Sequence, residues 1–166
     1  GIFLDATRRA ARSWPNIHYD EMLVDEAVHD LIIDSSHFDV VVAPNFYGDI
    51  MQDAGAGLSG GLDLVPTANV GDAFFLGHGS NLVSSAGIGV GGFASPIGHI
   101  RSAGMLLEHF GEVVAAQAVE EGVQRYLESG EVEKALTTDD IDRVIDRIIV
   151  EAQYCQHNIA LASGGA

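Results

Sequence analysis

The sequence predicts an α/β protein with a helical C-terminal part, and three observations carry this prediction. Residues 17–24, IHYDEMLV, alternate in the two-residue period that is typical of a strand. Residues 38–44, FDVVVAP, form an apolar, β-branched run suited to a strand that is covered on both faces. After Pro96, apolar residues recur at helical spacing almost to the end of the chain. Strands with helices between them, followed by helices alone, define this class.

The first half of the chain also contains three helical patterns. Residues 2–14 have apolar side chains at helical spacing, and Pro15 ends the segment. Residues 25–33 predict a short helix with Asp25 at its start, where a carboxylate suits the free N–H groups and the helix dipole. A longer helix is expected after Asn45, over the sequence YGDIMQDAGAGL.

A glycine-rich stretch divides this half from the helical end. Residues 59–95 predict loops and short strands, because they are too apolar for a plain linker. Three helices are expected to follow. The first begins at Pro96 and ends at Gly111, and the second ends before Gly130. The third begins near Thr137 and Asp140, which have the spacing of a capping box.

Composition excludes some classes of function. The chain has 166 residues, with 24 acidic against 8 basic side chains and a formal charge of −16, so it would repel a phosphate backbone and no nucleic-acid partner is expected. An acid-rich, lysine-poor surface suits a salt-rich cytoplasm, and a high-GC genome is an equally good explanation. Cys155 is the single cysteine, which excludes a disulfide framework.

No uninterrupted apolar stretch is long enough for a membrane span, so no membrane association is expected and a cytoplasmic location is the default. The chain opens at Gly1 directly in helical rhythm and without an initiating Met. We therefore expect that the sequence begins within a longer protein.

Asp49 and Asp53 form the first candidate site. On a helix, side chains at i and i+4 emerge on one face about one turn apart. Two carboxylates at that spacing can bind Mg²⁺ or Mn²⁺, with water and a substrate as the other ligands. The alternative is that Asp49 caps the helix and Asp53 is a solvated surface acid. Spacing alone leaves both interpretations open.

The surrounding sequence resembles the β-decarboxylating dehydrogenases, the isocitrate and 3-isopropylmalate dehydrogenase family. The stretch NFYGDIMQDAGAGLSGGLDLVPTANVGD, residues 45–72, is similar to that family's signature segment. The order of further matches agrees: residues 1–32 before it, HGS at 78–80, and SPIGHIRSAGMLLEHFGE after it. The resemblance implies the C-terminal part of that fold, a mixed sheet flanked by helices. Residues 1–45 would end the small dimer-interface domain, and 46–166 would belong to the large nucleotide-binding domain.

The resemblance also implies a chemistry and a set of site residues. The family oxidises a small 2-hydroxy acid with NAD or NADP and then releases a carboxylate as CO₂, using Mg²⁺ or Mn²⁺ as a Lewis acid. Asp49 and Asp53 match its metal carboxylates, and Asp25 matches the carboxylate that a neighbouring subunit supplies. His78, Gly79 and Ser80 match the loop around the adenosine half of the cofactor. The expected assembly is a homodimer, or a hetero-oligomer with a subunit that carries the N-terminal half.

Several family features are missing. The catalytic lysine, the catalytic tyrosine and the substrate-binding arginines would lie before residue 1, so no catalytic residue is assigned here. Phe75 stands where Glu is expected, and Val83 stands where an acidic residue usually binds the ribose of NAD. The sequence GIGVGG, 87–92, fits a cofactor-side loop or a phosphate-binding loop. We therefore predict a C-terminal portion or split subunit that is inactive alone. The alternatives are a non-catalytic regulatory or scaffolding subunit and a free-standing metal-binding domain. The substrate and the choice between NAD and NADP stay open.

Overall fold

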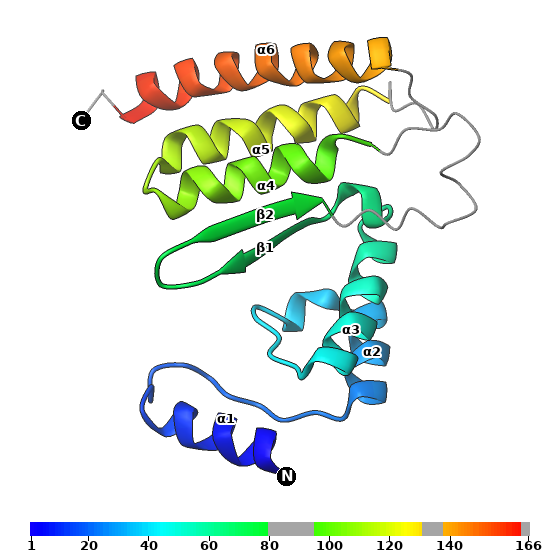
Figure 1. Ribbon diagram of the computed structural model, residues 1–166, viewed down its shortest axis with the longest axis vertical. Coiled ribbons are helices and arrows are strands. Elements are labelled where there is room, and N and C mark those ends of the chain that lie inside the picture. Colours follow the sequence, from blue (N-terminus) through cyan, green and yellow to red (C-terminus); the bar gives the residue numbers. More distant parts are fainter. Residues whose placement is uncertain (80–94, 131–137, 164–166) are drawn as a thin grey trace. The chain divides into compact units, whose positions relative to one another are not determined.

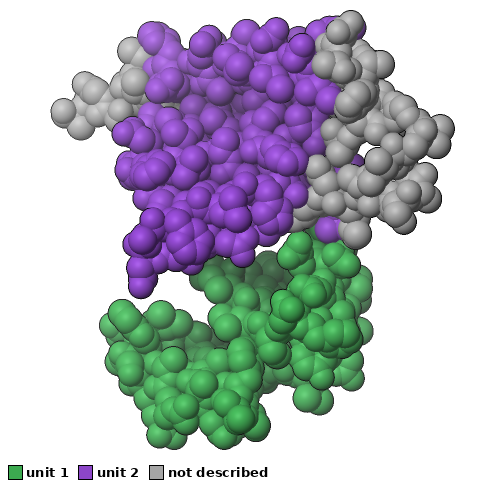
Figure 2. Space-filling model, in the orientation of Figure 1, with its two compact units in different colours: residues 1–58 green, residues 59–166 purple. Residues whose placement is uncertain are grey.

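The computed structural model describes residues 1–79, 95–130 and 138–163. The chain divides into two compact units, residues 1–58 and 59–166, coloured separately in Figure 2. Both units are mainly helical, and the sheet among the described residues has two strands. Ser80, Val83, the GIGVGG segment and Thr137 lie outside the described residues.

The first unit holds the three helices that the sequence predicts there. They are α1 (Ile2–Arg12), α2 (Val24–Ile33) and α3 (Asn45–Leu58), with a short 3₁₀ turn, η1 (Ser35–His37), after α2. Helix α2 packs against α3 (Figure 1), and Ala27, Met51 and Ala56 supply the buried side chains of this contact region. The pairing gives α3, which carries both aspartates of the candidate metal site, a fixed neighbour within the unit.

A polar network holds α1 to the segment that follows it. The Arg8 guanidinium donates two hydrogen bonds of 2.6 Å, from Nε and Nη2, to the carboxylate of Glu21. The Tyr19 hydroxyl donates to the same carboxylate over 3.0 Å and lies 3.0 Å from the Thr7 hydroxyl. Because Arg8 hydrogen-bonds the charged carboxylate, the pKa of Glu21 lies below its usual value.

The strands predicted at residues 17–24 and 38–44 are not formed, so these two predictions are wrong. Val24 opens α2, and residues 38–44 pair with no other described segment. Leu23 and Phe38 do have extended backbone angles. An extended segment becomes a strand only when a neighbour accepts its N–H groups and donates to its carbonyls. Val40 is 78% exposed instead of being covered on both faces.

The second unit begins with a 3₁₀ turn, η2 (Leu62–Leu64), and an antiparallel hairpin. Strands β1 (Pro66–Val70) and β2 (Phe75–Gly79) pair from Pro66 opposite Gly79 to Val70 opposite Phe75. The turn between them is closed by a 2.9 Å hydrogen bond from Gly71 N to Phe74 O. This hairpin confirms the prediction of short strands in the glycine-rich stretch, as far as the described residues extend.

Three helices complete the second unit. They are α4 (Ile97–His109), α5 (Val113–Glu128) and α6 (Thr138–Ser163), and α5 packs against both of the others while α4 covers the hairpin (Figure 1). Gly111 and Gly130 have φ of +84° and +71°, the left-handed conformation that ends helices, as predicted. The core of the unit consists of Ile97, Val123, Tyr126, Val144 and Ile148. Of the helices in the described ranges, none is both long and apolar enough to cross a membrane.

Candidate metal and cofactor sites

Helix α3 places Asp49 and Asp53 one turn apart, in the order that the sequence predicts. Both residues are exposed. Within the described residues neither carboxylate is engaged in a hydrogen bond or an ion pair. A Cβ at Gly48 would meet only ordinary contacts, the nearest being the Ala43 carbonyl oxygen at 3.8 Å. The start of α3 is therefore uncrowded, and two oxygen ligands on it are available to a hard cation.

Asp25 lies in the first turn of α2 and is exposed. Helix α2 packs on α3, yet the described part of the chain contains no group of three His, Cys, Asp or Glu side chains that could hold a metal ion. Asp25 is thus not brought together with Asp49 and Asp53 within this chain. Its assignment to a metal site shared with a second subunit stays a prediction.

The residues predicted to bind the cofactor lie at the end of β2. His78 is exposed, and its Nδ1 is 3.1 Å from the carbonyl oxygen of Gly79. Gly79 is buried against the start of α4, where an added Cβ would lie 2.8 Å from Nδ1 of His99. The absence of a Cβ at this position therefore favours the close approach of strand and helix. Ser80, the third predicted residue, is among those not described.

Sequence reasoning missed two residues of α4, of which Ser102 contacts the end of β2 and Arg101 contacts the residues before β1. The Ser102 hydroxyl is buried and lies 2.6 Å from the carbonyl oxygen of His78. The neighbouring Arg101 donates from Nη1 to the carbonyl oxygen of Leu64 over 3.0 Å, just before β1. In the sequence Ser102 stands between Arg101 and Ala103 in a predicted helix, so its immediate neighbours give no signal that it is buried. Its acceptor is 24 residues away in sequence, so no local pattern reveals it.

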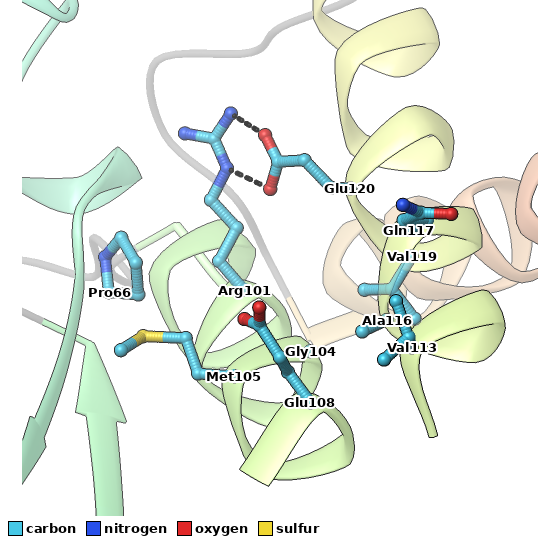
Figure 3. Close-up of a pocket in the computed structure, with 10 residues that line it drawn as sticks. All are labelled: Pro66, Arg101, Gly104, Met105, Glu108, Val113, Ala116, Gln117, Val119 and Glu120. Carbon is cyan, nitrogen blue, oxygen red and sulfur yellow. Dashed lines mark hydrogen bonds and ion pairs between the residues drawn. The ribbon is translucent and has the colours of Figure 1, made fainter. Parts of the chain in front are cut away.

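A shallow hollow of about 230 Å³ lies between α4, α5 and β1 (Figure 3). Its wall includes Pro66, Met105 and Val119, and Arg101 spans one side to reach Glu120. The Arg101 guanidinium donates from Nε and Nη2 to the two carboxylate oxygens of Glu120, over 3.1 and 2.7 Å. These donors are already used, so Arg101 does not offer them to an anionic ligand. None of the predicted site residues lines this hollow.

The arrangement of the described residues matches a known enzyme class. A crystal structure of a β-decarboxylating dehydrogenase from Thermococcus kodakarensis superposes with a TM-score of 0.73 and 25% identity, over 91% of this chain and 45% of that one. The described fold is therefore that of the C-terminal part of a β-decarboxylating dehydrogenase. A family model described as isocitrate/isopropylmalate dehydrogenase matches residues 2–154, and the chain belongs to that family.

The relatives that this chain matches include different dehydrogenases and a regulatory subunit. The chain is 41% identical to a 3-isopropylmalate dehydrogenase of Archaeoglobus fulgidus over 78% of its length, and 37% identical to an isocitrate/homoisocitrate dehydrogenase of Thermus thermophilus over 92%. It is 35% identical, over 80%, to a mitochondrial NAD-isocitrate dehydrogenase regulatory subunit from Dictyostelium discoideum. The matches span 40%, 45% and 37% of those three proteins, less than half of each. The resemblance stated from the sequence is confirmed at the level of the family.

Proposed function

We propose that this chain is the C-terminal portion, or a split subunit, of a metal- and NAD(P)-dependent β-decarboxylating dehydrogenase acting on a small 2-hydroxy acid of the isocitrate or isopropylmalate kind. The observation that carries the proposal is the pair Asp49 and Asp53, unengaged on one helix face in a chain of this family. A cytoplasmic location goes with this function.

The donor set fits a hard divalent cation. Two carboxylates one turn apart can supply oxygen ligands to Mg²⁺ or Mn²⁺, which keeps water and substrate in its other positions. Asp25 of a second copy of this chain would add the third carboxylate, so the complete metal site would require two copies of the chain. A partner that carries the N-terminal half would instead add the missing lysine, tyrosine and arginines. Such an ion, when bound, supplies Lewis-acid stabilisation of the developing enolate. What this chain itself contributes is to hold and orient that ion from α3.

The end of β2 would bind the other ligand, NAD or NADP. His78 is exposed and would contact the adenosine half, while Gly79 keeps the strand close to α4. No residue of the chain matches the family's proton-transferring lysine or its carboxylate-binding arginines. Without them the substrate hydroxyl has no acceptor for its proton and the carboxylates have no cationic clamp. The isolated chain is therefore expected to bind its ligands without turnover.

Calorimetry with Mn²⁺ tests the metal site directly. Asp49→Asn and Asp53→Asn should each weaken Mn²⁺ binding by about tenfold or more, since each removes a charged oxygen ligand. Asp142→Asn, an exposed acid of α6, makes the same charge change on another helix, without removing a proposed ligand, and should leave the affinity unchanged. Equal losses in all three variants would mean that Mn²⁺ senses only net charge, and the proposed site would be abandoned.

Turnover is tested by complementation. The chain is mixed with an N-terminal half from a relative, Mn²⁺ and NAD or NADP are added, and nicotinamide absorbance is followed with isocitrate and with isopropylmalate. Reduction that appears only in the mixture supports the proposal and identifies the substrate. Absence of reduction with either acid and with partners from several relatives counts against a catalytic role.

A non-catalytic regulatory or scaffolding subunit is the second candidate. It is favoured by Phe75 in the place of the family's Glu, packed with a ring-centroid distance of 5.3 Å on His109, and by the similarity to a regulatory subunit. Retained Mn²⁺ binding without measurable affinity for NAD or NADP would favour this candidate over the first.

A further inference from the structure

Ser102 stands out among the described residues as a buried polar side chain, 4% exposed, on the face of α4 that covers the hairpin. Its hydroxyl oxygen lies near three carbonyl oxygens: His78 at 2.6 Å, Gly98 at 2.9 Å and Thr67 at 3.4 Å. Two of these belong to the two strands, and the third belongs to the preceding turn of the same helix. A buried hydroxyl at this position therefore connects α4 to the hairpin.

The hydroxyl has one proton, so the three carbonyls compete for it. Gly98 is the i−4 residue, the acceptor that a helical serine uses when nothing else is near. The His78 oxygen is closer, at a distance typical of a good O–H···O hydrogen bond, while the Thr67 oxygen is well beyond that distance. The geometry favours donation to His78.

Three glycines allow this contact. A Cβ at Gly77 would lie 3.2 Å from the Ser102 Cβ, and one at Gly98 would lie 2.9 Å from the Val65 carbonyl oxygen. At Gly79 an added Cβ would lie 3.2 Å from the backbone nitrogen of His99. Side chains at these positions would push α4 off the hairpin, and the hydroxyl would lose its reach to β2.

We propose that Ser102 is a positioning residue for His78 and Gly79, the two described residues that are proposed to bind the cofactor. The His78 carbonyl and the Gly79 N–H share one planar peptide unit, so a hydrogen bond on that carbonyl fixes the whole unit. It thereby fixes the point from which the exposed His78 side chain projects. This inference rests on the proposed function, in which His78 and Gly79 contact the adenosine half of the dinucleotide. If the Ser102 hydroxyl donated only to Gly98 within its own helix, removing it would have no effect on β2.

Ser102→Ala removes the hydroxyl and keeps the Cβ. The variant should bind NAD about five- to tenfold more weakly than the native chain, the effect of one lost buried hydrogen bond. ADP-ribose should lose as much affinity as NAD, whereas nicotinamide mononucleotide and Mn²⁺ should bind as before. Ser129→Ala is the matched control: its hydroxyl also donates to a backbone carbonyl, Tyr126 O at 2.7 Å, but at the end of α5. It should leave all four affinities unchanged.

Amide hydrogen exchange provides a readout that needs no ligand. In Ser102→Ala, exchange at Gly79 should accelerate about fivefold relative to Ala68 in β1, because the peptide unit loses its anchor. Unchanged Gly79 exchange together with native NAD affinity would overturn the inference, as would an equal loss for nicotinamide mononucleotide. If the native chain binds no dinucleotide, the proposed cofactor function fails, and Gly79 exchange alone decides whether Ser102 holds the peptide.

Discussion

Two buried helical glycines of the second unit should respond in opposite directions to the same substitution. Gly104 lies in α4 and Gly122 in α5. Alanine is preferred over glycine inside a helix by about 1 kcal/mol, so propensity alone predicts that both Gly→Ala variants are stabilised. What differs is the space that the new methyl group would enter.

At Gly104 the nearest atom to an added Cβ is Cγ1 of Val119, at 3.5 Å, which is an ordinary contact. At Gly122 the nearest atoms are the Ile148 carbonyl oxygen at 2.9 Å and the Ala152 nitrogen at 3.0 Å. Both belong to the backbone of α6 and cannot rotate away, so α6 would have to move. Overpacking of this kind costs about 1–3 kcal/mol. We expect Gly104→Ala to gain about 0.5–1 kcal/mol and Gly122→Ala to lose about 1–2 kcal/mol.

Urea denaturation of the native chain and of both variants, followed by circular dichroism, measures this difference. The free energies of unfolding should differ between the variants by about 2 kcal/mol, or roughly 4–8 °C in Tm for a chain of this size. Equal gains in both variants would show that α5 and α6 do not approach as closely as the structure has them, and the argument from close packing would be wrong.

Two further predictions concern packing and pH. Ile148 is 2% exposed, while its neighbour Ile149 is 47% exposed. Ile148→Ala should therefore lower the free energy of unfolding by about 2–5 kcal/mol, and Ile149→Ala should lower it much less. Similar losses for both variants in urea denaturation would contradict the assignment of Ile148 to the core face of α6. The pKa of Glu21 is lowered from its usual value of 4.5, first because Arg8 donates a hydrogen bond to its carboxylate. The ionised Glu21 therefore stabilises the fold at pH values above 4.5, and this contribution is lost as the pH falls through the lower pKa of the folded state. In a carboxyl NMR titration Arg8→Met should raise the Glu21 midpoint, and an unmoved midpoint would refute the pairing.

Features of the chain that depend on neighbours in sequence were predictable. Gly111 and Gly130 end helices because the left-handed backbone conformation suits a residue without a Cβ. Asp49 and Asp53 share one helix face because four residues make about one turn, so their placement followed from spacing, while their role as metal ligands came from the family resemblance and stays a prediction. The family followed from the order of motifs, and the family match confirms it.

Other features depend on residues far apart in the chain, and only the tertiary structure decided them. The segment 38–44 has the composition of a buried strand but no described partner, since β propensity reflects packing against neighbours that a sequence does not place. The contact of Ser102 with His78 and the pairing of Arg101 with Glu120 join elements that the fold brings together. The sequence thus determined helix limits, the family and the aspartate pair. The tertiary structure decided which side chains are buried and which carbonyl each donor reaches, because those depend on packing between distant segments.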